Sequence, residues 1–160
     1  MKTDIGVLAE NRKKVSELLN VLLADETVLY IKTRNYHWNI EGPNFYGLHI
    51  LLENHYTELG VIIDDIAERV RQLGHKATAT MKEYLDTTTL KESSTDNEKL
   101  DEKGMLKNLV LDHEEIIKEL RDNIDKFDEE YDEPASADFV TNLVEKHEKM
   151  VWMLRSSVSK

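Results

Sequence analysis

The sequence predicts an all-α protein: a four-helix bundle with a long crossover that carries a short helix between the second and third long helices. Glycine and proline are scarce, at 6 and 2 of 160 residues, which disfavours a turn-rich β architecture. Apolar residues recur at helical spacing in four long segments. These observations together predict one domain that spans residues 1–160.

A glycine–proline break separates the first two predicted helices. The first runs from about Asp4 to about Trp38 and ends before Gly42 and Pro43, which break helices. Its apolar positions are Val15, Leu18, Leu22 and Leu29. The second helix is expected from about residue 44 to residue 73, where Gly74 ends it.

A poorly periodic connection, residues 75–94, follows the second helix, and its segment MKEYL favours a short helix. Thr95 and Glu98 form a capping box that predicts the start of the third helix, which continues through Phe127. Pro134 precedes the fourth helix, with Ser136 as its expected cap. Because the second connection is the long one, the first and second helices should form one antiparallel pair and the third and fourth another.

The composition excludes several classes of protein. The absence of cysteine excludes disulfide frameworks, zinc–thiolate sites and thiol catalysis, and it fits a reducing, cytoplasmic setting. No signal peptide is recognisable, and no apolar run approaches the roughly 20 residues that span a bilayer, so no membrane association is expected. A formal net charge of -11 should attract cations and repel nucleic acid.

The second predicted helix has two faces. The stripe expected in the core consists of Leu48, Leu52, His55, Leu59, Ile62, Ile66, Val70 and Leu73. The other face is polar and titratable and carries His49, Glu53, Gly60 and Asp64, with Glu68 at its margin.

The six histidines divide into structural and functional candidates. His55, His113 and His147 occupy core positions and should be buried histidines with one hydrogen bond each, and His75 lies in a loop. His37 and His49 lie off the core stripes and have carboxylates nearby, which favours a metal-ligand role. No histidine follows a glutamate by three residues, so the Glu-x-x-His site that di-iron bundles carry in their interior is not predicted.

The spacing of the polar face predicts a site shared between two chains. His49 and Glu53 are one helical turn apart, as are Asp64 and Glu68, but about 16 Å of helix rise separates the two pairs. A two-fold axis near Gly60, where small residues let helices approach, would bring His49 and Glu53 of one chain against Asp64 and Glu68 of the other. His37 would join them from the end of the first helix.

Imidazole and carboxylate ligands without sulfur suit iron or manganese, and zinc would also bind. Open coordination positions would allow redox chemistry with oxygen or peroxide. Trp38 and Tyr56 lie near in sequence; they could scavenge oxidising equivalents, although packing explains both.

The run YHWNIEGPNFYGLHILLENHYTELGVIIDDIAERV resembles the signature region of Dps, the DNA-binding protein from starved cells, in the ferritin-like superfamily. The signature is His-Trp-Asn, then Leu-His twelve residues later, then Asp-x-x-Ala-Glu-Arg. The segment ADFVTNLVEKHEKMVWMLRSSV resembles the closing helix of the same family. Helix order and lengths also fit, so the resemblance covers nearly the whole chain.

The resemblance implies a dodecameric shell with di-iron ferroxidase sites between subunits. These oxidise Fe(II), preferably with hydrogen peroxide, and store ferric mineral, which protects against oxidative damage. By motif position the catalytic and metal ligands are His37, His49, Glu53, Asp64 and Glu68. The family usually has aspartate where Glu53 stands. Asp138 and the acids of residues 125–133 lie where the family lines its entry pores.

DNA binding is less favoured by the sequence. Residues 1–7 offer one lysine, offset by Asp4, and the last five residues offer one more, whereas DNA contacts need many cations. Three alternatives remain: a DNA-binding, nucleoid-protecting shell whose metal is largely structural, an assembled scaffold that holds zinc, and a monomeric bundle.

Overall fold

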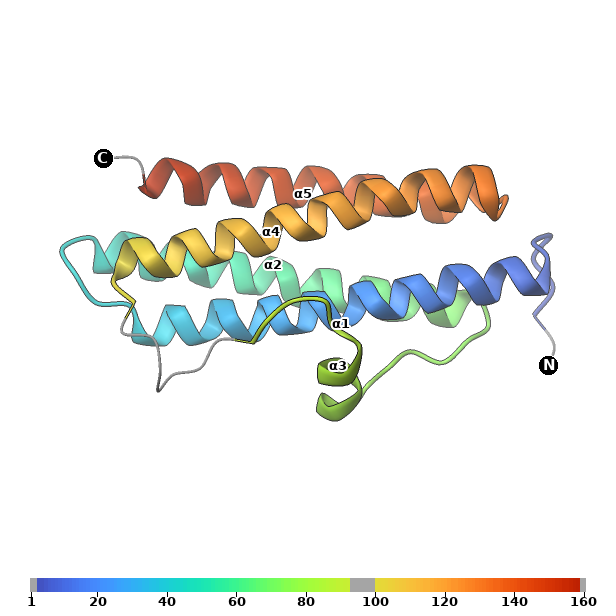
Figure 1. The fold of residues 1–160 in the computed structure, drawn as a ribbon, viewed down its shortest axis with the longest axis horizontal. Coiled ribbons are helices and arrows are strands. Elements are labelled where there is room, and N and C mark those ends of the chain that lie inside the picture. The colour runs from blue at the N-terminus through green and yellow to red at the C-terminus, as the bar shows by residue number, and fades with distance from the viewer. Residues whose placement is uncertain (1–2, 93–99, 159–160) are drawn as a thin grey trace.

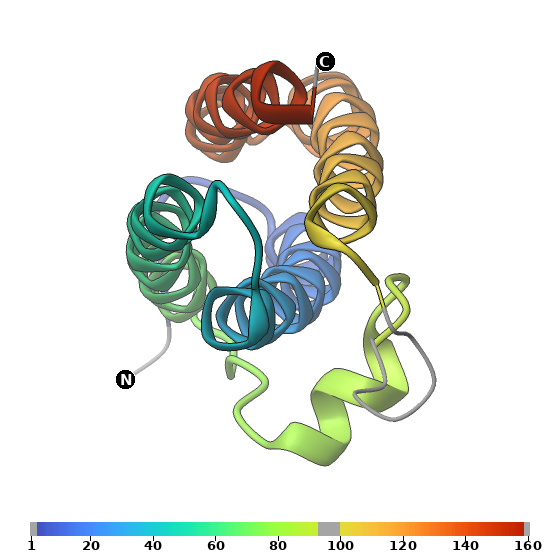
Figure 2. The same ribbon diagram turned by 90° about the vertical axis from the view of Figure 1, so that its left-hand side faces the viewer.

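Residues 3–92 and 100–158 are described by the computed structural model, which is all-α, with long helices lying side by side (Figure 1). In chain order these are α1 (Ala9–Asn39), α2 (Phe45–Gln72), α4 (Glu102–Asp125) and α5 (Pro134–Val158), and the short α3 (Met81–Thr87) lies in the connection. The end-on view shows α1 beside α2 and α4 beside α5 (Figure 2). The predicted bundle, crossover and helix pairing are confirmed. No helix in the described part of the chain is long and apolar enough to cross a membrane.

The starts of two helices differ from the prediction for local reasons. α1 begins at Ala9 instead of Asp4, because Gly6 has a φ of +81° and Leu8 is extended, so the preceding residues turn away from the helix axis. α4 begins at Glu102, where the carboxylate of Asp101 accepts a hydrogen bond from the Gly104 amide. The capping box predicted at Thr95 and Glu98 lies outside the described residues.

The predicted cap of the fourth helix is wrong. Pro134 is the first helical residue, a position where its missing N–H costs nothing. The Glu133 carboxylate accepts the Ser136 amide at 2.7 Å and also pairs with the guanidinium of Arg69 from α2. Ser136 instead accepts a hydrogen bond from Arg69 through its hydroxyl oxygen. The acidic segment before α5 is a π-helical turn, Lys126–Glu130, that buries Phe127.

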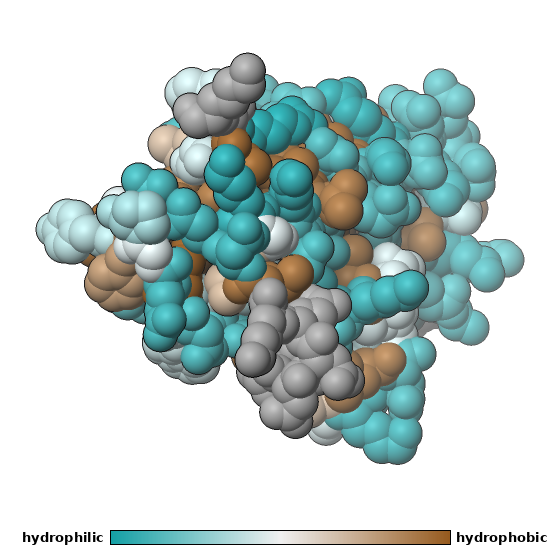
Figure 3. All heavy atoms as spheres, turned by 60° about the vertical axis from the view of Figure 1, so that its left-hand side comes forward, coloured by the Kyte–Doolittle hydropathy of each residue, from teal (hydrophilic) through white to brown (hydrophobic). Residues whose placement is uncertain are grey.

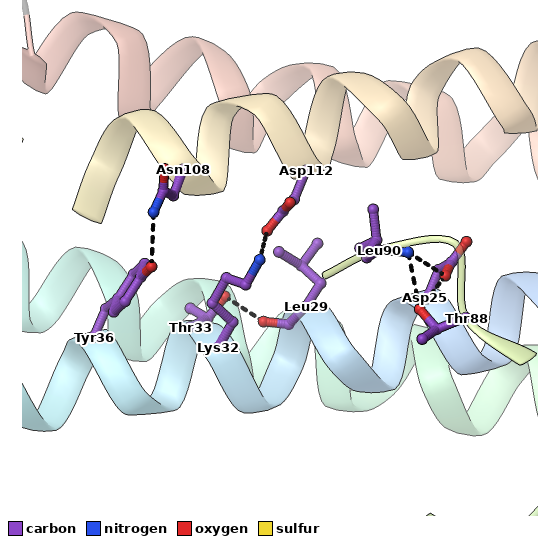
Figure 4. Close-up of polar contacts among 9 residues, drawn as sticks. All are labelled: Asp25, Leu29, Lys32, Thr33, Tyr36, Thr88, Leu90, Asn108 and Asp112. Atoms are coloured by element: carbon purple, nitrogen blue, oxygen red, sulfur yellow. Dashed lines mark hydrogen bonds and ion pairs between the residues drawn. The ribbon is translucent and has the colours of Figure 1, made fainter. Parts of the chain in front are cut away.

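α1 is the central helix of the bundle. All residues from 22 to 29 are buried, so this helix lacks the single apolar stripe seen in α2. It is covered by α2, by α4 and by the crossover, which together leave no open face in its middle. Lys32 pairs with Asp112 of α4 at 2.6 Å, and Asn108 donates to the Tyr36 hydroxyl at 3.1 Å (Figure 4).

The crossover is anchored on one buried carboxylate, that of Asp25. It accepts hydrogen bonds from the Thr88 hydroxyl, from the Thr89 amide at 2.6 Å and hydroxyl at 2.7 Å, and from the Leu90 amide at 3.3 Å. Figure 4 shows Asp25 pointing from α1 towards this segment. Four donors therefore depend on one side chain that is 0% exposed.

Glu119 of α4 gives the folded protein a specific pH dependence. Burial, a hydrogen bond to Asp25 and the negative charge of Asp25 raise the pKa of Glu119 from 4.5 to about 8. The folded state thus keeps this proton to higher pH than the unfolded state. Its stabilising contribution is complete below the ordinary pKa and is lost as the pH rises to about 8.

Glu119→Gln should therefore unfold with a flatter pH profile than the wild type. We expect the wild-type free energy of unfolding to fall, relative to this variant, between the ordinary pKa of 4.5 and about 8. Urea titrations at several pH values measure the difference. Glu115→Gln, at an exposed position of the same helix, is the matched control. Parallel profiles for the wild type and Glu119→Gln would show that the carboxyl does not hold the extra proton.

Candidate metal centre

His37 and His49 meet where the end of α1 lies beside the beginning of α2. The turn at Gly42 and Pro43 reverses the chain between them. Their rings stack with centroids 3.8 Å apart and planes 18° from parallel. His37 is only 6% exposed, and His49 is half-buried. The two imidazoles singled out by the sequence are therefore brought together within one chain.

Reciprocal hydrogen bonds fix the tautomer of both neutral rings. His37 Nδ1 lies 2.9 Å from the backbone oxygen of His49, and His49 Nδ1 lies 2.9 Å from the backbone oxygen of His37. A carbonyl oxygen only accepts, so each Nδ1 carries the hydrogen and donates it. Each neutral ring then keeps its lone pair on Nε2, the arrangement that orients metal-binding histidines in proteins. The donor chemistry of this pair fits a divalent transition metal.

The three predicted carboxylates follow along α2. Glu53, one turn after His49, is half-buried, and Asp64 and Glu68 are exposed. None of these carboxylates accepts a hydrogen bond or joins an ion pair among the described residues. Asp64 lies 11 residues beyond Glu53, about 16 Å along the helix. No three histidine or acidic side chains of the described residues gather closely enough to hold a metal. One chain therefore presents two separated parts of a ligand set.

None of the described residues lies so close to position 60 that a glycine is required there. A Cβ at this residue would lie 3.7 Å from the ring of Tyr30, an ordinary contact distance. The backbone there is helical and partly exposed, midway between the two groups of candidate ligands. A close approach from outside the chain would account for the small residue.

An aromatic cluster with one arginine lies beside the histidine pair. Tyr56 packs edge-on against His37, with ring centroids 5.1 Å apart. The guanidinium of Arg34 lies over the rings of Tyr30, Trp38 and Tyr56 at 4.7 to 5.5 Å. Arg34 is not among the residues predicted from the sequence to belong to the site. Its spacing of four residues from both Tyr30 and Trp38 was the available signal.

The three core histidines are buried as predicted. The prediction that each of them makes one hydrogen bond is wrong. His147 Nδ1 pairs with His113 Nδ1 at 2.9 Å, and its Nε2 lies 2.8 Å from Glu26, too poorly aligned for a hydrogen bond. Neither nitrogen of His55 has a partner in the described part of the chain. Burial, and then the charge of His147, lowers the pKa of His55 to about 4.

The surface over this end of the bundle is mostly hydrophilic, with hydrophobic side chains between the polar ones (Figure 3). Large exposed apolar residues of α1 and α2 are Ile31, Trp38, Phe45, Tyr46, Ile50 and Val61. Their presence on the two helices that carry the candidate ligands is consistent with a contact surface for a further chain.

Comparison with known proteins places the chain in a family. Residues 16–160 match the ferritin-like domain model. An uncharacterised low-temperature-induced protein of Nostoc sp. is 45% identical over 98% of this chain and 87% of its own length. The DNA protection during starvation protein of Brevibacillus brevis is 40% identical over 98% of both chains.

A solved structure supports the same assignment. Dps from Vibrio cholerae O1, described as a member of a broad superfamily of ferritin-like diiron-carboxylate proteins, superposes with a TM-score of 0.90 and 30% identity. The match covers 99% of this chain and 98% of that one. The chain belongs to the Dps family within the ferritin-like superfamily.

Proposed function

We propose that this protein is a ferroxidase and iron-storage protein whose di-iron sites lie between subunits. The family supports iron storage and DNA protection in general. The observation that carries the proposal here is the reciprocal pair formed by His37 and His49, whose Nδ1 atoms are both engaged by carbonyl oxygens, so that each neutral ring has its lone pair on Nε2. The carboxylates of Glu53, Asp64 and Glu68, which have no partner among residues 3–92 and 100–158, lie on the same helix as His49 and supply the remaining oxygen ligands.

The site is completed by a second copy of the chain. His37, His49 and Glu53 of one protomer would meet Asp64 and Glu68 of a neighbour whose α2 runs in the opposite direction. A two-fold contact is self-complementary, so each dimer has two identical sites. Assembly of such dimers into a dodecamer in the cytoplasm would enclose the stored mineral.

The chemistry is a two-electron reduction of hydrogen peroxide. Two Fe(II) ions each give one electron, the O–O bond breaks, two protons are taken up, and two water molecules and two Fe(III) ions result. Because both electrons arrive together, hydroxyl radical is not released. The imidazoles bind the ferrous substrate, and the carboxylates favour the harder ferric product.

Titration of anaerobic protein, loaded with Fe(II), against hydrogen peroxide tests this function. We expect about two Fe(II) oxidised per peroxide, because each peroxide accepts two electrons at a site that holds two ions. The ferric product should elute with the protein on size exclusion. A ratio near one, with radical adducts on a spin trap, would contradict the paired-electron reaction. Zinc, which suits the same ligands, should compete with Fe(II) and slow the oxidation.

Protection of DNA by direct binding is the second candidate, and it is favoured by the name of the Brevibacillus relative. The charge of -11 per chain opposes it, because phosphate contacts need cationic side chains. We propose that protection acts through removal of iron and peroxide. A gel shift at low salt should leave DNA unretarded, and retardation would favour the nucleoid-protecting shell.

A further inference from the structure

A pocket of about 350 Å³ lies between α2 and α5, and none of the five candidate iron ligands lines it. Its wall includes His55 of α2 and, from α5, Met150 and Met153. At its rim Lys146 pairs with Glu58 at 2.8 Å. The pocket connects the surface of the bundle with a buried imidazole for which the iron chemistry has no use.

His55 is unusual because it is 3% exposed and neither of its ring nitrogens has a partner among the described residues. A buried polar group without a hydrogen bond is costly, and one that persists in a native protein calls for an explanation, such as a bound ion or a functional role. A neutral imidazole always has one nitrogen with a free lone pair. His55 therefore offers a donor atom to whatever enters the pocket.

A second imidazole lies behind His55. The ring of His113 has its centroid 6.2 Å from that of His55, and its Nε2 also lacks a partner. The Nδ1 atoms of His113 and His147 lie 2.9 Å apart, so one of these two rings donates a hydrogen bond to the other. When His113 is the donor, its lone pair is on Nε2. Rings that share one ion at about 2.1 Å per nitrogen have centres roughly 5 to 6.5 Å apart.

The interior of the bundle also favours a cation. Glu26 is 0% exposed, and the Nε2 atom of His147 lies 2.8 Å from its carboxylate. The negative charge of Glu26 also contributes to the raised pKa of Glu119. No lysine or arginine of the described chain pairs with Glu26. The negative charge of Glu26 would attract a positive ion bound in the interior of the bundle.

The donor set selects the class of ion. Met150 is 5% exposed and lies one helical turn before Met153, so both thioethers belong to the same side of α5. Thioethers with neutral imidazoles are soft donors, which select Cu(I) over the harder divalent ions. We propose that this pocket binds one Cu(I) ion through His55, Met150 and Met153, with His113 behind it. This site is independent of the histidine pair proposed for iron.

Anaerobic competition with a chromophoric Cu(I) chelator tests the proposal on the assembled protein. The wild type should bind one Cu(I) per chain, and X-ray absorption should show both sulfur and nitrogen neighbours. His55→Leu and the double variant Met150→Leu/Met153→Leu should each weaken Cu(I) binding by more than about 10-fold, the loss that even an outer-shell change can cause. Leucine and methionine have similar volumes, so the double methionine variant should keep the fold.

Matched controls separate this site from the others. Met81→Leu, at an exposed position of α3, and His37→Ala/His49→Ala should both bind Cu(I) like the wild type. Unchanged affinity in Met150→Leu/Met153→Leu, or a spectrum without sulfur neighbours, would overturn the proposal. Loss of Cu(I) in His37→Ala/His49→Ala would overturn it as well, since the ion would then occupy the iron site. Fe(II) oxidation should proceed at the wild-type rate in Met150→Leu/Met153→Leu. The Cu(I) proposal and the iron-oxidation proposal can therefore be contradicted independently of each other.

Discussion

Replacing His37 and His49 together with alanine should abolish the fast phase of Fe(II) oxidation. Each imidazole supplies a lone pair on Nε2 only because the other residue's carbonyl holds its Nδ1 hydrogen. Loss of even an outer-shell partner costs about 10 to 100-fold in metal affinity or activity, so loss of both direct ligands should slow oxidation by more than about 100-fold. Stopped-flow absorbance of the ferric product after mixing Fe(II) with peroxide measures the rate.

The control for this variant must separate chemistry from folding. His75→Ala changes a half-buried histidine in the loop after α2 and should oxidise Fe(II) at the wild-type rate. His37→Gln/His49→Gln retains polar side chains of similar reach at the close of the α1–α2 turn and should still lack the fast phase. Circular dichroism and size exclusion verify that each variant folds and assembles. A wild-type rate in a folded double variant would remove these histidines from the site.

Asp25→Ala should lower the free energy of unfolding by about 2 to 4 kcal/mol, because one buried carboxylate accepts several hydrogen bonds from the crossover. The substitution removes the acceptor of the Thr89 amide and of two threonine hydroxyls, which are half-buried or exposed. The buried Leu90 amide loses Asp25 but keeps the Thr88 hydroxyl at 3.1 Å. Each unsatisfied buried donor costs about 1 to 3 kcal/mol, and water that enters the loosened crossover recovers part of it. Urea denaturation monitored by circular dichroism measures the change.

The stability control is Asp86→Ala, which removes an exposed carboxylate in the same crossover. Its ion pair with Lys82 is at the surface, and such pairs contribute about 0 to 1 kcal/mol. Asp25→Asn retains part of the hydrogen bonding and should lie between the two alanine variants. A loss below about 1 kcal/mol in Asp25→Ala would show that the crossover is anchored elsewhere.

Much of the fold was predictable because one helix has a simple environment. Every position of the apolar stripe assigned to α2 is buried, since that helix presents one side to the core and the helical period is sufficient to identify it. The same period fails for α1, where residues 22–29 are buried on all sides. Three neighbouring elements cover that helix, and their arrangement is not encoded in its local pattern.

Contacts between distant residues account for what the sequence did not reveal. Glu133 replaces Ser136 as the cap of α5 because Arg69, 64 residues away, holds its carboxylate in place. The anchoring role of Asp25 depends on partners more than 60 residues away. His37 and His49 could be selected because they lie off the core stripes, but their reciprocal bonds depend on the turn that joins α1 and α2. Whether Asp64 and Glu68 join them depends on a second chain.

Complementation between two inactive variants tests the shared site most directly. His37→Ala/His49→Ala and Asp64→Ala/Glu68→Ala should each be inactive alone. If they are unfolded and reassembled together in equal amounts, half of the dimers are mixed, and each mixed dimer contains one intact site of two. We expect about a quarter of the wild-type rate of Fe(II) oxidation from the mixture. A mixture that assembles fully and yet stays inactive would contradict a site built from two chains.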